Sequence, residues 1–216
     1  MTQVTGEHVN QVPETTIERL PVYLRCLHEA QAMRIPVISS VGIAQMSGGN
    51  AAQVRKDLSY LGEFGTRGIG YEVDSLAGHI AKALGLTQQR RVALVGLGRL
   101  GSALLSYGGF GDRGMTWVAV YDSDPDKVGT PAGGGLLVRG SAELAATLPE
   151  LGPGIAVITT PANAAQEVAD AIVAAGVRSI LNFAPVTLEV PEHVTLRQVD
   201  LSVELQILSF HLAEGS

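Results

Sequence analysis

The sequence predicts an α/β protein with two main parts, a small helical part over residues 15–86 and a doubly wound parallel sheet over residues 87–200. Short helical patterns separated by glycines fill the first part, and alternating apolar strands and helices fill the second. A glycine-rich turn directly follows the first of those strands. Residues 1–14 are polar, lack an apolar period and are expected to be disordered, whereas residues 201–216 are expected to form a separate terminal helix.

The composition is that of a globular chain, with 216 residues and 46% hydrophobic content, enough for a packed core. The one cysteine, Cys26, excludes an intrachain disulfide and a multi-cysteine metal site, so no metal is expected. The first thirty residues lack the pattern of a signal peptide. No apolar stretch approaches the roughly 20 residues that a membrane span needs. We therefore expect a cytoplasmic protein without membrane contact.

The net charge of −6 argues by itself against a nucleic-acid binder, because phosphate contacts require clustered Lys and Arg. The charge is uneven, however. Residues 1–85 hold 7 Lys and Arg against 8 Asp and Glu, whereas residues 86–216 hold 8 against 13. A DNA-binding role must therefore rest on a motif in the first part.

The first helix is expected to start at Thr15, with Thr15 or Thr16 as its cap, and to end near Ala32. Its apolar residues follow helical spacing, and Pro21 predicts a kink or a later start.

Two shorter helices should follow, over residues 40–46 after the hydroxyls of Ser39-Ser40 and over residues 51–61. Asn50 with Gln53 resembles a capping box for the third helix. Three short helices with a tight turn between the last two are typical of a helix-turn-helix.

Glycines 65, 68 and 70 predict a turn between two short strands, of which Tyr71–Val73 is the return strand, and this hairpin would be a wing. A further helix is expected over Ser75–Leu84 with Asp74 as its cap. The polar residues 87–90 then mark a domain boundary.

The second part alternates buried strands with helices, which predicts a Rossmann-type sheet. The expected strands are 92–95, 117–121, 136–138, 155–159 and 179–182, and the expected helices lie near 100–107, 141–148 and 162–175.

The turn Gly96-Leu97-Gly98-Arg99-Leu100-Gly101 follows a strand and opens a helix, the context in which a G-x-G-x-x-G pattern binds a dinucleotide. Gly96 allows the tight turn, Gly98 lets a pyrophosphate approach, and Gly101 lets helix and strand pack closely. Asp122 ends the next strand, where a carboxylate accepts hydrogen bonds from ribose hydroxyls and repels a 2′-phosphate. We therefore expect the ligand to be NAD(H) rather than NADP(H). The alternative is that the glycine turn serves only the packing of helix and strand.

Two later strands end in Thr159-Thr160-Pro161 and Asn182-Phe183-Ala184-Pro185, at the edge where ligands of such sheets bind. These segments either border the nicotinamide half of the ligand or are ordinary turns. Residues 91–189 contain no His and one Lys, Lys127, which is placed for adenosine or surface contact. Because hydride transfer commonly needs a His, Lys or Tyr beside it, we expect a cofactor-binding domain that is not an enzyme and has no catalytic residues.

On the third helix, Arg55, Lys56 and Ser59 would share an exposed face, suited to base edges or phosphates in the major groove. Arg67 at the glycine turn could enter a minor groove. Charge alone equally fits a solvated helix beside a flexible hairpin.

Together, the strings at residues 53–60, 62–71, 92–101, 107–110 and 182–185 closely resemble the Rex family of redox-sensing transcriptional repressors. This resemblance implies a homodimer that binds near-palindromic operator DNA through winged helices, holds NADH or NAD+ as a regulatory ligand, and releases DNA when NADH rises. The apolar helix from Leu201 to Leu212, expected from its pattern to pack on another subunit, would be swapped into the partner.

The resemblance also assigns residue roles. Arg55, Lys56, Ser59 and Tyr60 match the recognition helix, Arg67 and Gly68 match the wing, and Arg25, Tyr107 and Asp200 match a switch between DNA-binding and nucleotide-binding parts. Two rival functions remain at this point, a small NAD-dependent oxidoreductase and a CoA-binding module, because both use a similar glycine turn.

Overall fold

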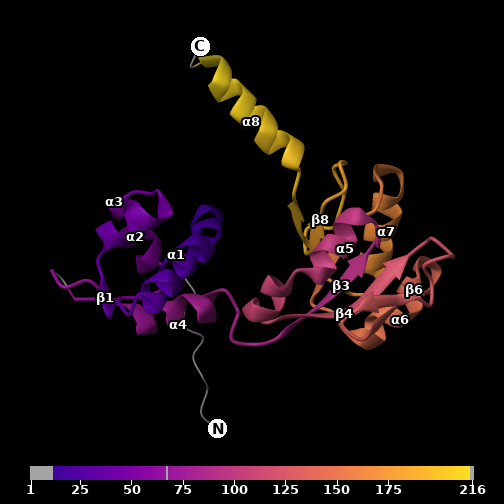
Figure 1. Cartoon of the computed structure of the whole chain (residues 1–216), viewed down its shortest axis with the longest axis horizontal. Helices are drawn as coiled ribbons and strands as arrows, with labels where there is room; N and C mark the ends of the chain where they lie inside the picture. Colours follow the sequence, from indigo (N-terminus) through magenta and orange to yellow (C-terminus); the bar gives the residue numbers. More distant parts are fainter. Residues whose placement is uncertain (1–11, 67, 215–216) are drawn as a thin grey trace, which may run out of the picture. The chain divides into compact units, whose positions relative to one another are not determined.

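The computed structural model describes residues 12–66 and 68–214 and forms two compact units, Met1–Gln88 and Gln89–Ser216 (Figure 1). The expectation that residues 1–14 are disordered concerns mostly residues outside the described range. It is wrong at its end, because Glu14 already begins the first helix.

In its described residues, unit 1 contains four helices and one small antiparallel sheet. The helices are α1 (Glu14–Ala32), α2 (Ser40–Ser47), α3 (Ala51–Ser59) and α4 (Val73–Ala83), and the strands are β1 (Val37–Ile38) and β2 (Tyr71–Glu72). They enclose an apolar core that includes Leu20, Leu24, Leu27, Ile43, Val54, Leu58, Leu76 and Ile80. The short turn at Gly48 and Gly49 separates α2 from α3, which gives the helix-turn-helix arrangement.

The helix caps agree only partly with expectation. The Ser39 cap is confirmed, since its Oγ accepts a hydrogen bond from the Gly42 amide at 3.1 Å. For α3, Asn50 Oδ1 accepts from the Ala52 amide at 2.7 Å, but Gln53 does not complete a capping box. Its Nε2 donates to Asp57 instead.

The expected caps of α1 and α4 are wrong. Helix α1 follows Pro13 without a side-chain cap, and the Thr16 hydroxyl donates to Asp57 Oδ1 instead. Helix α4 begins at Val73, so Asp74 lies in its first turn. The Asp74 carboxylate does not cap the helix, and its Oδ1 accepts a hydrogen bond from Gln31 Nε2 of α1.

The predicted wing hairpin is reduced to one bridge, between Thr66 and Gly70. The return strand β2 pairs instead with β1, with Val37 opposite Glu72 and Ile38 opposite Tyr71. A glycine is needed at position 70, because φ is +114° and an added Cβ would lie 2.6 Å from the Ile38 carbonyl oxygen.

Unit 2 is a seven-stranded sheet in the order β5-β6-β4-β3-β7-β8-β9, parallel except for β5. Its strands are β3 (Arg90–Val95), β4 (Met115–Asp122), β5 (Pro131–Gly133), β6 (Leu136–Gly140), β7 (Ile155–Ile158), β8 (Ser179–Asn182) and β9 (Thr195–Gln198). Its α-helices are α5 (Arg99–Ser106), α6 (Leu144–Leu151), α7 (Ala162–Ala174) and α8 (Leu201–Glu214), with 3₁₀ turns over Gly108–Arg113 and Ser141–Glu143. The predicted doubly wound sheet is confirmed, although β5 and β9 were not expected.

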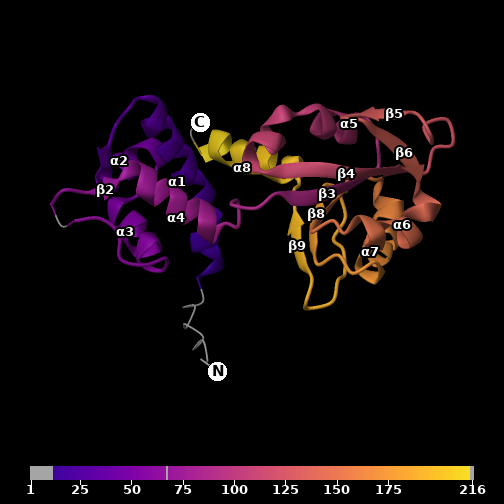
Figure 2. The same cartoon turned by 90° about the horizontal axis from the view of Figure 1, so that it is seen from below.

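Figure 2 shows α6 and α7 on one side of the sheet and α5 on the other. The α6 and α7 side has the larger core, in which Tyr121, Leu148, Ile158 and Ile172 are fully buried. On the other side the core is smaller, and Leu181 of β8, the strand next to the edge strand β9, is only half-buried. The prediction that this strand is buried on both faces is therefore wrong for the isolated chain.

The predicted terminal helix is present as α8, and its apolar side chains are exposed. Their exposed fractions lie between 46% and 74% for Leu201, Val203, Leu205, Ile207, Leu208, Phe210 and Leu212. In the described part of the chain, no helix combines the length and the hydropathy that crossing a membrane requires.

Candidate functional site

The glycine turn after β3 has the geometry that its spacing predicts. Gly96 has a φ of +100°, and a Cβ there would lie 2.9 Å from the carbonyl group of Thr159. A Cβ at Gly101 would overlap the Gly96 carbonyl oxygen, so this glycine lets α5 start against the turn. Around Gly98 an added Cβ would meet no described atom within 4 Å, which leaves its backbone open to a ligand at the start of α5.

Asp122 lies beside this turn and is 8% exposed. Its Oδ2 accepts hydrogen bonds from the Leu97 amide at 2.6 Å and from Lys127 Nζ at 3.1 Å, and its Oδ1 accepts from the Asp124 amide at 2.9 Å. Burial alone would raise the pKa of Asp122, but these donors outweigh it and lower the pKa. The site therefore holds an ionised carboxylate at neutral pH, fixed by Leu97 and Lys127.

A cavity of about 740 Å³ opens next to the turn. From the predicted set it is lined by Gly96, Gly98, Asp122, Lys127, Thr160 and Pro161. The cavity is also lined by Ser123 on a loop, Ser141 on the turn after β6 and Glu167 on α7, none of which was predicted. These residues carried no motif.

The residues of this cavity fit a dinucleotide. Within the described residues, the buried Thr160 Oγ1 has no hydrogen-bond partner and is available to a ligand. Gly98 offers close approach to an amide-rich helix start, and Asp122 offers a carboxylate acceptor for hydroxyls. Phosphate and ribose groups require this combination of donors and acceptors.

The other predicted nucleotide residues do not line this cavity. Arg99 and Leu100 are exposed on the first turn of α5. Ala184 is buried and Pro185 exposed in the loop after β8. Asn182 is fully buried, where its Nδ2 donates to Gln198 Oε1 at 2.7 Å and its Oδ1 accepts from the Ala184 amide at 2.9 Å. The Asn182 side chain thus shapes its own loop.

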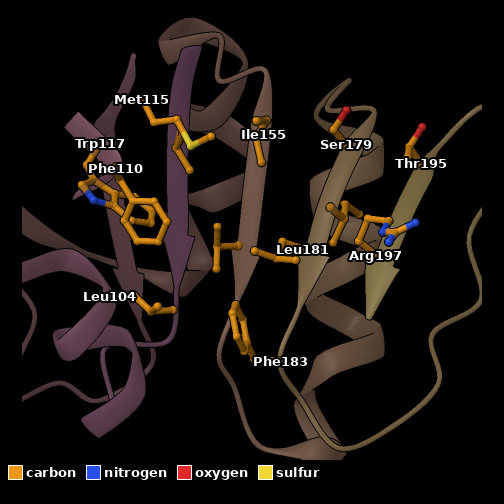
Figure 3. A pocket seen from close by; sticks show the side chains of 13 residues that line it. Leu104, Phe110, Met115, Trp117, Ile155, Ser179, Leu181, Phe183, Thr195 and Arg197 are labelled. Atoms are coloured by element: carbon orange, nitrogen blue, oxygen red, sulfur yellow. The ribbon is translucent and has the colours of Figure 1, made fainter. Parts of the chain in front are cut away.

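Phe183 points into a second, apolar cavity of about 270 Å³ (Figure 3). This cavity lies across β3, β4, β7, β8 and β9 and is lined by side chains that include Leu104, Phe110, Trp117, Ile155 and Leu181. Because its lining is mostly apolar, this cavity suits apolar side chains rather than phosphates.

Helix α3 exposes the side chains that were expected to read DNA. Arg55, Lys56 and Ser59 are exposed and Tyr60 is half-buried, whereas Val54 and Leu58 are buried. Arg55 Nη1 donates to Ser40 Oγ at 2.9 Å, which ties the arginine to the start of α2. Arg67 lies outside the described residues, and Gly68 is exposed with a φ of +83°.

Asp57, which was not predicted as a functional residue, is fully buried in α3 between the exposed residues. Its carboxylate accepts hydrogen bonds from Thr16, Arg19 and Tyr23 of α1 and from Gln53 of α3. Burial alone would raise the pKa of Asp57, but these donors lower it to about 2.

The three residues predicted to form a switch have separate surroundings. Arg25 is exposed on α1. Tyr107 follows α5, is 53% exposed, and stacks edge to face with Phe110 at a centroid distance of 5.2 Å. Asp200 precedes α8, and its Oδ1 accepts hydrogen bonds from the amide and hydroxyl of Ser202, which lower the pKa of Asp200.

Two family models match the chain. One is described as a putative DNA-binding protein N-terminus and matches residues 11–59, and the other is described as a CoA binding domain and matches residues 87–186.

Similar proteins extend over both units. The redox-sensing transcriptional repressor Rex of Streptomyces griseus subsp. griseus is 52% identical over 200 residues, which cover 93% of this chain and 79% of that protein. The protein of the same name from Desulfitobacterium hafniense is 48% identical and covers 94% of this chain and 96% of its own length.

Solved structures of a Rex-family repressor called RSP are also similar. RSP in complex with beta-NAD+ and operator DNA has a TM-score of 0.90 at 33% identity and covers 94% of each chain. RSP in complex with beta-NADH has a TM-score of 0.86 at 31% identity and covers 95% of this chain and 96% of its own.

Proposed function

Because the chain belongs to the Rex family of redox-sensing transcriptional repressors, we propose that it binds operator DNA as a homodimer and releases it when NADH binds. The observation that carries this proposal is the extent of the relationship, which spans 93% of the chain and so includes both units. A repressor of this kind acts where the chromosome is, so we propose a cytoplasmic location.

The proposed DNA-reading surface is the exposed side of α3. Arg55 and Lys56 can hydrogen-bond base edges or phosphates. Ser59 lies one turn further along the same helix, and Tyr60 is the residue directly after it. Arg67 and Gly68 are proposed to contact DNA as a wing. Binding by two symmetry-related helices explains how a chain of net charge −6 can recognise DNA, since specificity comes from local contacts and half-site spacing.

The proposed nucleotide site is the 740 Å³ cavity. The turn from Gly96 to Gly101 would hold the pyrophosphate at the start of α5, and Asp122 would accept hydrogen bonds from the adenosine ribose. Because the ionised Asp122 would repel a 2′-phosphate, NAD(H) is preferred over NADP(H). Lys127 orients this carboxylate, and the loop Asn182–Pro185 would border the nicotinamide half.

The cofactor serves as a regulatory ligand and the protein is not an enzyme, as in its relatives, which are transcriptional repressors. NAD+ carries a positive charge on a flat ring, whereas the dihydronicotinamide ring of NADH is neutral. We propose that Arg25, Tyr107 and Asp200 form alternative pairs that respond to this difference. A ligand can shift such an equilibrium only by its differential affinity for the two arrangements.

The proposed dimer uses α8. Seven exposed apolar side chains on this helix are more than a solvated helix needs, and they match in character the open apolar cavity on the sheet. A partner's helix placed there would complete the core of each subunit.

The test is a titration of NADH and of NAD+ into the protein bound to a palindromic operator duplex. We expect release by NADH at lower concentration than by NAD+. Persistence of the complex at saturating NADH, with occupancy confirmed by calorimetry, would contradict the proposal. Arg55→Ala and Lys56→Ala should each weaken operator binding by about 1 to 3 kcal/mol without changing NADH affinity.

The CoA-binding alternative is favoured by one observation, the family model described as a CoA binding domain. A thermal-shift comparison of NADH and CoA separates the two, because the true ligand raises the unfolding temperature at lower concentration.

A further inference from the structure

The buried carboxylate of Asp57 stands in the middle of the proposed recognition helix and is 0% exposed. Its two oxygens accept five hydrogen bonds. Arg19 donates twice, from Nε to Oδ2 at 2.6 Å and from Nη2 to Oδ1 at 2.8 Å. Tyr23 Oη donates to Oδ2 at 2.8 Å, and Thr16 Oγ1 and Gln53 Nε2 donate to Oδ1 at 2.9 and 2.8 Å.

Most of these donors come from one face of another helix. Thr16, Arg19 and Tyr23 follow each other at spacings of three and four residues, so they lie along one stripe of α1. Gln53 comes from α3 itself, one turn before Asp57. A single side chain of α3 is therefore held from several directions by α1.

The position of Asp57 relates this anchor to the exposed face of α3. Arg55, Lys56 and Ser59, each within two residues of Asp57 in the chain, are exposed, while Asp57 turns toward the core. A rotation of α3 about its axis would move these exposed side chains and would also break the directional hydrogen bonds to α1.

We propose that Asp57 is a positioning residue for DNA recognition, which fixes the rotation of α3 against α1 and so directs Arg55 and Lys56 at the bases. This inference rests on the proposed function of α3 as a recognition helix.

An apolar residue would join two helices at less cost than a buried carboxylate does. The Asp57 carboxylate is removed from water and loses solvation energy, which its attraction to the partly exposed Arg19 repays only with good geometry, so the pair is a weak source of stability. Directional bonds from a bidentate arginine and two hydroxyls select one geometry, as apolar contacts do not. The arrangement therefore suits orientation more than cohesion.

The test compares full-length Asp57→Asn and Tyr23→Phe with the wild type and with a matched control, Asp74→Asn. The control weakens an exposed hydrogen bond between Gln31 and Asp74 that joins α1 to α4, at 2.8 Å, and does not involve α3. Four quantities are measured: the dissociation constant for the operator, that for an unrelated duplex, that for NADH, and the unfolding temperature.

For Asp57→Asn we expect operator affinity to fall about 10- to 100-fold, as charge-assisted hydrogen bonds are lost. Tyr23→Phe, which removes one hydroxyl, should lower it about 3- to 10-fold. Affinity for the unrelated duplex and for NADH should stay within about twofold, because these depend on unchanged phosphate and nucleotide contacts. The control should match the wild type in all four measurements.

Unchanged operator affinity in a folded Asp57→Asn protein would overturn the inference. A parallel loss of affinity for both duplexes would also overturn it, because cohesion alone predicts that pattern. Should Asp57→Asn fail to fold, Tyr23→Phe decides by the same two outcomes. Failure of the proposed function is a different result, in which the wild type itself shows no operator preference or no release by NADH.

Discussion

Gly98→Ala tests the nucleotide site with little disturbance of the chain. A Cβ at this position would meet no described atom within 4 Å, and the φ of −82° is accessible to alanine. The cost to folding is that of a weaker cap of α5, about 0.5 to 1 kcal/mol. The methyl group would instead stand where the pyrophosphate is expected to approach the backbone.

The expected loss of binding follows from the hydrogen bonds that the methyl group would displace. Charge-assisted bonds from backbone amides to phosphate contribute about 1.5 to 3 kcal/mol each. Loss of one such bond raises the NADH dissociation constant about 10- to 100-fold. The variant should still bind operator DNA, but NADH at wild-type releasing concentrations should leave the complex intact.

Gly101→Ala is the contrasting variant, because its methyl group would overlap the Gly96 carbonyl oxygen inside the protein. Moving α5 to relieve this overlap should cost about 1 to 3 kcal/mol. The unfolding temperature should fall by about 4 °C for each kcal/mol. Calorimetric titration with NADH and differential scanning calorimetry measure the two effects. A folded Gly98→Ala protein with wild-type NADH affinity would show that the phosphates bind elsewhere and would refute the reasoning.

Three further predictions concern other parts of the molecule. Asp122→Ala should raise the NADH dissociation constant about tenfold by removing the ribose acceptor, and an unchanged constant in calorimetry would place the ribose away from β4. Leu208→Asp on α8 should raise the dimer dissociation constant at least about tenfold in sedimentation experiments, whereas Ser209→Asp on the same helix should have a smaller effect; equal effects would count against an apolar seam. The folded-state pKa of Asp57 is about 2, below the ordinary value of 3.8. The ionised Asp57 side chain therefore contributes to the free energy of unfolding above about pH 4, and this contribution is lost as the pH falls toward 2. Urea unfolding should therefore show the stability difference between wild type and Asp57→Asn shrinking by about 1.5 kcal/mol between about pH 5 and pH 2.5, and a constant difference would contradict this.

Local signals in the sequence predicted the parts of the fold that depend on near neighbours. Ser39 caps α2 as its hydroxyl and position indicate, and the turn from Gly96 to Gly101 has the predicted geometry because its constraints act within a few residues. The strands Val37–Ile38 and Thr195–Gln198 were missed because each is short and neither is joined to its pairing partner by a tight turn. Sequence distance hides such pairings.

Asp57 was missed for a different reason. It stands in the polar string Arg55-Lys56-Asp57, which indicates a solvated face. Its spacing from Val54 and Leu58, three residues and one, places it on the core side of α3 and could have identified it. A buried acid requires donors, and these come from α1, more than 30 residues away in the sequence.

Asp200 directly precedes α8, and this position suggests how nucleotide binding is coupled to a swapped helix. Both hydrogen bonds from Ser202 go to Oδ1 of Asp200. A carboxylate can accept several hydrogen bonds at once, so Asp200 can cap α8 and still accept one from an arginine or a tyrosine. The proposed exchange between Arg25 and Tyr107 would then act on the first turn of the helix that is expected to join the subunits. Because that helix is linked to Asp200 by the cap, we expect a change of partner at this carboxylate to act on the proposed dimer contact.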